Sequence, residues 1–292
     1  MPEHDPATFR PPRRSSSGGL AAAVLALLLA AGAAWWFWGR TPAPPTAPPA
    51  VTAPTPPVAA AAEPQASGPQ NPLETLQPPD ASLPDLAVSD AHVADALGPL
   101  LGRGNVASLL QTDGFVRRVV ATVDSLTRPQ APTRVWPVHP TAPRFLVEGQ
   151  GDAQHVAAAN AKRYDRLLTV AEVVPKEALA TAYARLYPLF QQAYEELGYP
   201  RGYFNDRLVA VLDHLQQAPE PQGPLRVQLT EVKGEMRDPR PWVRYEFADP
   251  ELQGLSSGQK ILVRMGLANE RRAKALLAEF RRHVATGAVA RK

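Results

Sequence analysis

Ser257 and Lys260 form the pattern with the clearest chemical meaning in the sequence, a serine followed three residues later by a lysine. On a helix these side chains lie one turn apart, so the amine can act as the base that activates the hydroxyl for acyl transfer. Penicillin-binding enzymes add Ser-Asp-Asn and Lys-Thr-Gly elements, and neither occurs in this sequence. Ser256 or Ser257 also fits a helix N-cap, in which the hydroxyl binds a free backbone N–H. We favour the N-cap and keep acyl transfer on peptidoglycan as the alternative.

A row of aromatic residues follows one face of a predicted helix. The row consists of Tyr183, Tyr187, Phe190 and Tyr194, at the spacing i, i+4, i+7 and i+11. Such a row usually packs into a protein core. The alternative is a groove for a glycan or a peptide, in which the tyrosine hydroxyls face water and the rings contact the ligand.

The last predicted helix is rich in basic residues, with two acidic residues among them. A run of this kind is usually a solvated helix face. The alternative is a binding patch for anionic lipid headgroups or for an acidic protein partner. The basic residues are Arg271, Arg272, Lys274, Arg281 and Arg282.

Composition excludes several other kinds of site. The chain has no cysteine, so a disulfide, a thiol nucleophile and a zinc–thiolate site are ruled out. Its six histidines form no His-Glu-x-x-His motif and no pair four residues apart, and we predict no metal site and no cofactor. A net charge of +3 on 292 residues does not indicate a nucleic-acid-binding protein.

Residues 20–38 form a run of 19 residues without charge or proline. As a helix the run is roughly 30 Å long, which is the thickness of the hydrocarbon core of a bilayer. Basic residues are concentrated on its N-terminal side, where Arg10, Arg13 and Arg14 lie, while Arg40 alone follows closely. This asymmetry predicts a cytoplasmic tail over residues 1–19 and an export of everything that follows the run.

The end of this run indicates an anchor that is not cleaved. Three tryptophans and a phenylalanine occupy positions 35–38, and such rings favour the membrane–water interface. The alternative is a cleaved signal peptide, because small residues occur at positions 30–34. A signal peptide, however, ends its apolar run in a small-residue cleavage site and not in four aromatic rings.

Residues 39–79 are predicted to be a disordered linker rich in proline and alanine. Positions 41–79 hold 13 of the 33 prolines of the chain. Proline removes backbone donors and favours the polyproline II conformation, so helices and sheets cannot form across this segment. Fully extended, the linker reaches on the order of 120 Å. We interpret it as a spacer that holds the domain away from the membrane.

Residues 80–292 have the composition and periodicity of one mainly helical domain with a small β-hairpin. Apolar residues recur at helical spacing along most of this region. Alternating apolar and polar residues at 225–232 and 242–247 predict two strands that pair as a hairpin across residues 234–241. The predicted helices span about residues 89–101, 106–111, 113–123, 152–173, 175–198, 205–215, 256–265 and 269–285.

Several short stretches resemble the bacterial family called domain of unknown function 3014. The resemblance extends from about residue 82 to residue 285 and implies a membrane-anchored envelope domain, without an assigned activity or site. The stretches that carry it are 83–86 with Ser89-Asp90, Arg163-Tyr164, Tyr187-Pro188-Leu189 with Ala193-Tyr194, Leu197-Gly198-Tyr199-Pro200, Phe247-Ala248-Asp249-Pro250-Glu251-Leu252, and Gly258-Gln259-Lys260 with Arg264-Met265-Gly266.

Together these observations predict a single-pass protein of the bacterial inner membrane. Its N-terminus is expected in the cytoplasm, and its helical domain in the periplasm as a non-catalytic interaction or scaffold domain for an envelope protein partner. Two alternatives stay open: a peptidoglycan-directed acyl-transfer enzyme that uses Ser257 and Lys260, and a glycan-binding module.

Overall fold

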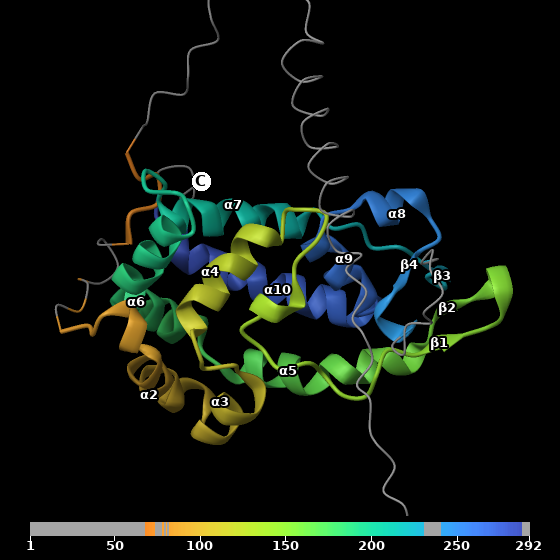
Figure 1. The fold of residues 1–292 in the computed structure, drawn as a ribbon, viewed down its shortest axis with the longest axis horizontal. Helices are drawn as coiled ribbons and strands as arrows, with labels where there is room; N and C mark the ends of the chain where they lie inside the picture. Colours follow the sequence, from red (N-terminus) through yellow and green to blue (C-terminus); the bar gives the residue numbers. More distant parts are fainter. Residues whose placement is uncertain (1–67, 74–77, 79, 81, 231–240, 288–292) are drawn as a thin grey trace, which may run out of the picture. The chain divides into compact units, whose positions relative to one another are not determined.

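The computed structural model describes residues 68–73, 78, 80, 82–230 and 241–287 (Figure 1). The chain divides into two compact units, Met1–Glu63 and Pro64–Lys292, and every described residue belongs to the second unit. The predicted membrane anchor at 20–38 and most of the predicted linker therefore lie outside the described residues. Among the helices that are described, none combines the length and the apolar composition needed to cross a bilayer.

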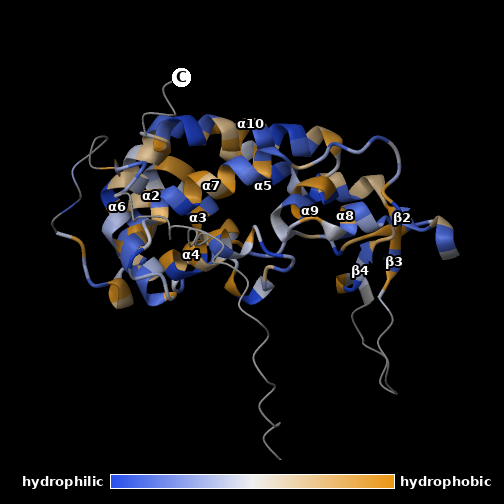
Figure 2. Cartoon of the chain, turned by 90° about the horizontal axis from the view of Figure 1, so that it is seen from above, coloured by the Kyte–Doolittle hydropathy of each residue, from blue (hydrophilic) through white to orange (hydrophobic). Residues whose placement is uncertain are grey.

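Four helices form the main core: α4 (Phe115–Ser125), α6 (Lys176–Glu196), α7 (Phe204–Gln216) and α10 (Leu267–Val284). Each carries an apolar stripe at helical spacing, and the stripes pack against one another. Figure 2 shows α7, in which hydrophobic and hydrophilic residues are interleaved, below α10, which is mostly hydrophilic. The most deeply buried residues of these helices include Val116, Val120, Ala184, Phe204, Val211 and Val284.

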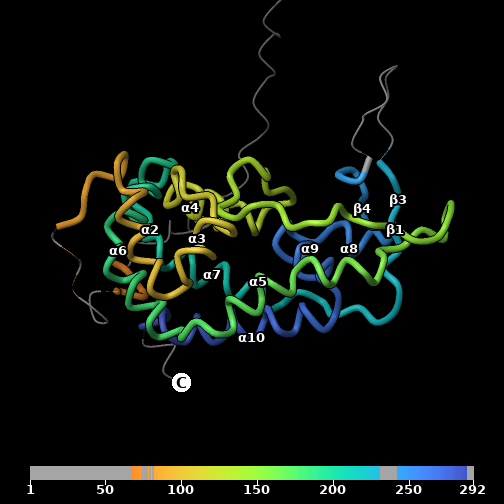
Figure 3. Tube along the Cα trace, turned by 90° about the horizontal axis from the view of Figure 1, so that it is seen from below, coloured from red at the N-terminus to blue at the C-terminus, as the bar shows by residue number. Residues whose placement is uncertain are grey.

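Three further helices cover this core. α2 (Asp90–Leu101) packs on α6 and leads into the short α3 (Arg103–Leu109). α5 (Lys162–Val173) runs alongside α10, as Figure 3 shows. The start of α4 is stabilised from α2, because Asp90 Oδ2 accepts a hydrogen bond of 2.8 Å from the backbone N–H of Gly114.

Two small antiparallel hairpins accompany the helices, so the predicted fold class is confirmed in its main feature and extended by one hairpin. β3 (Val227–Leu229) pairs with β4 (Tyr245–Phe247) as the alternation predicted, and in the observed register Val227 lies opposite Phe247. The connection of this hairpin lies largely outside the described residues. The hairpin that was not predicted joins β1 (Val147–Glu148) to β2 (His155–Val156).

The helix predicted over 152–173 begins ten residues later than expected, at the first residue of α5. The reason is a side chain that offers the backbone other hydrogen bonds. Asn160 is buried, and its amide donates to Leu146 O at 2.6 Å and to Ala157 O at 2.9 Å, while its Oδ1 accepts from Leu146 N. These bonds hold residues 146–161 as hairpin and turns.

The two hairpins are joined and share a small core of their own. β2 and β3 lie side by side, with Val156 N donating to Leu225 O and Val227 N donating to Gln154 O, both at 2.9 Å. Val227 and Phe247 pack there against Val263, which lies on the helix Ser257–Arg264. The remaining elements are α8 (Pro250–Gly254), α9 (Ser257–Arg264) and the 3₁₀ turns η2 (Leu86–Val88), η3 (Thr133–Val135), η4 (Gly151–Ala153), η5 (Ala158–Ala161) and η6 (Pro241–Val243).

Residues 68–73 belong to the domain, although the sequence assigned them to the linker. Leu73 is 1% exposed and is part of the main core. The backbone N–H groups of Gln70 and Asn71 donate to the Asp206 carboxylate at 2.9 and 2.8 Å. Thr286 Oγ1, just after α10, donates to Pro72 O at 2.8 Å. The domain boundary predicted at residue 80 is therefore too late.

Candidate functional site

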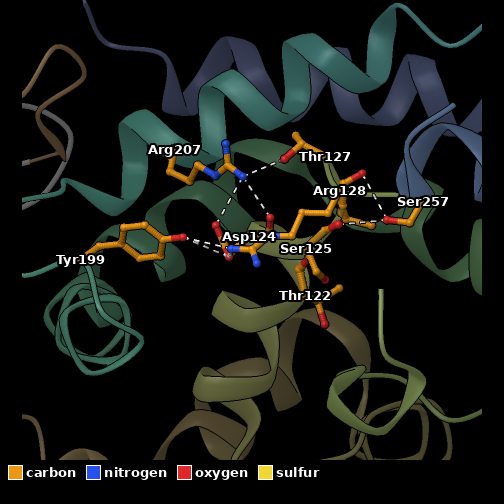
Figure 4. A network of polar contacts seen from close by, with 9 residues as sticks. Thr122, Asp124, Ser125, Thr127, Arg128, Tyr199, Arg207 and Ser257 are labelled. Atoms are coloured by element: carbon orange, nitrogen blue, oxygen red, sulfur yellow. Dashed lines mark hydrogen bonds and ion pairs between the residues drawn. The ribbon is translucent and has the colours of Figure 1, made fainter. Parts of the chain in front are cut away.

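Ser257 lies where the N-terminus of α9 meets the C-terminal end of α4. Its backbone N–H donates to Arg128 O at 2.7 Å, and its hydroxyl donates to Ser125 O at 2.9 Å (Figure 4). The N–H of Gly258 donates to Leu126 O at 2.9 Å. The first N–H groups and last C=O groups of helices lack partners within their own helix. In this junction the free groups of the two helices satisfy one another.

The N-cap of α9 is Ser256, which confirms that interpretation of the serine pair. Ser256 Oγ accepts from Gln259 N at 3.3 Å, and Gln259 Oε1 accepts from Ser256 N at 3.4 Å, which together form a capping box. His214 Nε2, on α7, lies 2.8 Å from Ser256 Oγ. No sequence pattern indicated this serine–histidine contact, because the two residues lie 42 positions apart.

Lys260 is oriented toward a different group. Its Nζ donates to Gln253 O at 3.1 Å, on the preceding α8. Burial, and secondarily the charge of Arg264, lower the pKa of Lys260. That direction suits a base, yet the polar atoms of both Ser257 and Lys260 are engaged with backbone carbonyls. The contacts of the pair stabilise the start of α9.

We expect Ser257→Ala to lower the free energy of unfolding by about 1 kcal/mol, because the variant loses one buried hydrogen bond and leaves Ser125 O with one donor fewer. Chemical denaturation followed by circular dichroism measures this change. A variant as stable as the parent would show that the hydroxyl does not contribute to the junction.

A buried carboxylate extends this junction toward α7, as Figure 4 shows. The side chain of Asp124 is 7% exposed and contacts the guanidinium groups of both Arg128 and Arg207. Arg207 Nη2 also donates to Asp124 O at 2.9 Å and to Thr127 Oγ1 at 2.7 Å. Tyr199 OH lies 3.4 Å from Asp124 Oδ2. The network links α4, α7 and the segment between α6 and α7. The spacing i, i+4 indicates the pair of Asp124 and Arg128, whereas no spacing pointed to Arg207 or Tyr199.

The aromatic row of α6 lies in the core. Tyr183, Tyr187, Phe190 and Tyr194 are between 5% and 8% exposed. Burial raises the pKa of Tyr183 well above its usual value, with smaller contributions from two neighbouring tyrosines, and its hydroxyl lies 3.3 Å from Asn205 Oδ1. The spacing therefore reflects core packing, and these rings do not form an open groove.

The basic residues of α10 are mostly paired with acids of the same domain. Arg282 is exposed. Four of the five form ion pairs that tie α10 to neighbouring segments: Arg271 with Glu220, Arg272 with Glu172, Lys274 with Glu220, and Arg281 with Asp213. These pairs neutralise most of the charge that a lipid or an acidic partner would need.

A cavity of about 360 Å³ lies between the hairpins and the turn from α9 to α10. Its wall combines apolar side chains with the charged or titratable residues Glu148, His155, Arg264 and Glu270. These residues come from segments that are far apart in the sequence, so sequence patterns could not group them.

Glu270 is the unusual residue of this cavity. It lies in the first turn of α10 and is 1% exposed. Its Oε1 has almost no accessible surface and forms an ion pair with Lys274 Nζ, 3.4 Å away. Burial raises the pKa of Glu270, and the nearby Lys274 opposes that effect. A buried carboxylate with one ammonium as its partner is an unusual member of a cavity wall.

Comparison with protein families gives a match that spans the core of the domain. Residues 115–281 match the family model described as "Protein of unknown function (DUF3014)", which takes in α4 to most of α10, both hairpins and the whole cavity wall. No curated protein and no solved structure matches the chain. The match covers more than half of the chain and agrees with the resemblance noted in the sequence. The chain belongs to the DUF3014 family.

Proposed function

We propose that the chain is a single-pass protein of the bacterial inner membrane that presents its helical domain in the periplasm for interaction with another envelope protein. The observation that carries the proposal is the uncharged run at 20–38, with three arginines before it and a proline-rich segment after it. The linker gives the domain reach on the order of 100 Å from the membrane.

The internal contacts of the domain support a scaffold role. Ser257, Lys260, the aromatic row of α6 and most of the basic residues of α10 take part in folding contacts. The cavity between the hairpins remains as a recess for a partner. We therefore propose a domain that binds and positions another molecule.

Fusion of alkaline phosphatase after residue 292 tests the topology, because this reporter is active only outside the cytoplasm. We expect an active fusion, and an inactive one when residues 20–38 are deleted. A fusion to green fluorescent protein, which does not mature after export in unfolded form, is the matched control and should be dark. A bright, phosphatase-inactive chain would contradict the proposal.

In-cell crosslinking of the tagged full-length protein then tests the interaction. We expect an envelope protein to be recovered in near-equal amounts and to be lost when residues 68–292 are deleted. Recovery that is independent of these residues would contradict a scaffold role of the domain.

The contact between Ser256 and His214 favours acyl transfer as a second candidate function. A serine hydroxyl 2.8 Å from a histidine nitrogen has the geometry of a nucleophile and its base. A fluorophosphonate probe, which labels nucleophilic serines, distinguishes Ser256 from Ser257 of the Ser-x-x-Lys pattern as the nucleophile. Labelling lost in Ser256→Ala and kept in Ser257→Ala would establish Ser256 as the nucleophile, and an unlabelled parent chain would exclude both.

A further inference from the structure

The strands of the two hairpins form one antiparallel row in the order β1-β2-β3-β4. Each hairpin supplies two of them, and an antiparallel bridge between His155 of β2 and Arg226, just before β3, joins the hairpins. Figure 1 shows the strands in this order, with β1 and β4 at the two ends of the row. A row of this kind has two edges, where every second residue points its backbone N–H and C=O away from the neighbouring strand.

The edge formed by β4 is closed by side chains. Tyr245 and Phe247 point their backbone groups away from β3, because the bonds to β3 are made by the residues that alternate with them. Phe247 N donates to Gln253 Oε1 at 3.0 Å, and Tyr245 O accepts from Arg264 Nη2 at 3.0 Å. Side chains of α8 and α9 thus take the place of a further strand.

The edge formed by β1 is open. Val147 lies opposite Val156, and Val156 N donates to Leu225 O at 2.9 Å on the side of β3. Val147 and Val156 are therefore a pair that exchanges no hydrogen bonds, so the N–H and C=O of Val147 point away from β2. Within the described part of the chain, no group forms a hydrogen bond with the backbone of Val147.

The open edge continues toward the N-terminal side of β1. Leu146 faces β2, because its carbonyl oxygen accepts from Ala157 N at 3.1 Å. By alternation Phe145 faces outward as Val147 does, and none of the described residues bonds to its backbone either. Gly149, with φ of 85°, turns the chain at the other end. Phe145 and Val147 thus offer their N–H and C=O groups to an incoming strand.

The side chains beside this edge indicate which strand fits it. Val147 packs on the second core, so an apolar residue opposite it would extend that core. On the other face Leu146 is 43% exposed and the side chain of Glu148 is 58% exposed. The Glu148 carboxylate has His155 Nε2 as a neighbour at 3.7 Å, and that ring is charged only when protonated. A basic residue opposite Glu148 would supply a permanent counterion.

We propose that the edge of β1 binds an extended segment of a partner protein as an added strand, with a basic residue opposite Glu148 and apolar residues opposite Leu146 and Val147. The inference rests on the proposed function, since it assigns the surface through which the domain contacts its partner. A second copy of the chain fits this edge less well. Two β1 strands paired about Val147 place Glu148 of each copy opposite Leu146 of the other, without a counterion.

Titration of the full-length protein in detergent micelles with the peptide acetyl-Thr-Lys-Val-Val-Thr-amide tests the proposal. The control peptide carries an N-methyl group on its central valine, which keeps every side chain and removes the N–H that would donate to Val147 O. We expect a dissociation constant of about 1 mM for the first peptide, because few bonds form, and at least about tenfold weaker binding of the control.

The amide signals of protein labelled with nitrogen-15 valine read both the affinity and the position. We expect the signal of Val147 to move with the peptide concentration. Equal binding of both peptides, no binding of either, or a response confined to valines outside the β1–β2 hairpin would overturn the proposal.

Val147→Pro removes the outward N–H and leaves the bonds between β1 and β2 in place, because an edge strand tolerates proline where the N–H faces solvent. We expect this variant to fold and to bind the first peptide about tenfold more weakly. Glu148→Gln is expected to weaken binding about twofold to threefold. Glu246→Gln, on β4, is its matched control and should bind as the parent does.

Circular dichroism establishes which of these variants fold. Unchanged affinity in a folded Val147→Pro chain would overturn the proposal. Should that variant fail to fold, the comparison of Glu148→Gln with Glu246→Gln decides, and equal affinities of these two would overturn the proposal as well.

Sedimentation of the parent chain in micelles separates a partner from a second copy. We expect a monomer, and a dimer that Val147→Pro dissociates would assign the edge to a second copy and overturn the proposal. In cells, Val147→Pro is expected to lower recovery of the crosslinked envelope protein about tenfold. Unchanged recovery would contradict the assignment to β1 and leave the scaffold role intact, whereas a failed phosphatase fusion would contradict the topology and leave the peptide titration intact.

Discussion

Asp124→Ala is expected to lower the free energy of unfolding by about 3 kcal/mol, the largest effect of any single polar substitution that we predict. The side chain of Asp124 is 7% exposed and contacts two guanidinium groups. Its removal takes away the carboxylate that pairs with the guanidinium of Arg207. The side chain of Arg207 is 29% exposed, and its Nε already lacks a hydrogen-bond partner among the described residues. Arg128 is 55% exposed and can regain water, which keeps the loss near the lower end of the range for broken buried pairs.

Urea denaturation followed by circular dichroism measures this loss. Asp124→Asn retains the shape and an acceptor, and we expect it to fall between the parent and the alanine variant. Arg117→Gln removes one partner of the exposed pair between Arg117 and Glu196, so it serves as the control and should cost no more than about 0.5 kcal/mol. Equal losses in Asp124→Ala and Arg117→Gln would show that burial gives the Asp124 network no special role.

Gly258→Ala is expected to lower the free energy of unfolding by about 2–3 kcal/mol. A Cβ atom at this position would lie 2.5 Å from Leu215 Cδ2 and 2.9 Å from Leu126 O. The methyl group of Leu215 can move away by a change of rotamer. The carbonyl of Leu126 is part of the backbone and cannot, because it accepts the hydrogen bond from Gly258 N that holds α9 against α4. The junction must therefore open to admit a methyl group.

Gly254→Ala is the matched control for this substitution. Gly254 ends α8, and no atom lies within 4 Å of the Cβ that alanine would add. Because alanine favours the helical state over glycine by up to about 1 kcal/mol, we expect this variant to be as stable as the parent or slightly more stable. Thermal melting of the two variants side by side decides the prediction, and a tolerated alanine at position 258 would contradict it.

The helices were predictable because their apolar stripes carry the signal. α6, α7 and α10 each repeat apolar residues at helical spacing, and Gly266, with φ of 82°, lies between the two predicted helices 256–265 and 269–285 as the N-cap residue of α10. The β1–β2 hairpin was missed because each strand has only two residues. A strand so short shows no alternation, and its position depends on hydrogen bonds from Asn160.

The candidate site was less accessible to sequence reasoning than the fold. Spacing drew attention to Ser257 and Lys260, whose neighbours in space then show that their contacts hold helix ends together. Glu270 gave no sequence signal, because its meaning depends on burial and on a wall built from distant segments. Local patterns record how a residue fits its own helix, whereas a cavity is a property of elements that meet only after folding.

The packing of residues 68–73 has a mechanical consequence. A force that pulls on the chain ahead of Gly68 reaches Asn71 and Leu73 before it reaches any helix of the core. Asn71 is held by Asp206 and by Asn205 Nδ2, which also donates to Val284 O, so the load is shared between α7 and the end of α10. If the chain is anchored ahead of Gly68 as proposed, two separate helices of the core hold its attachment point.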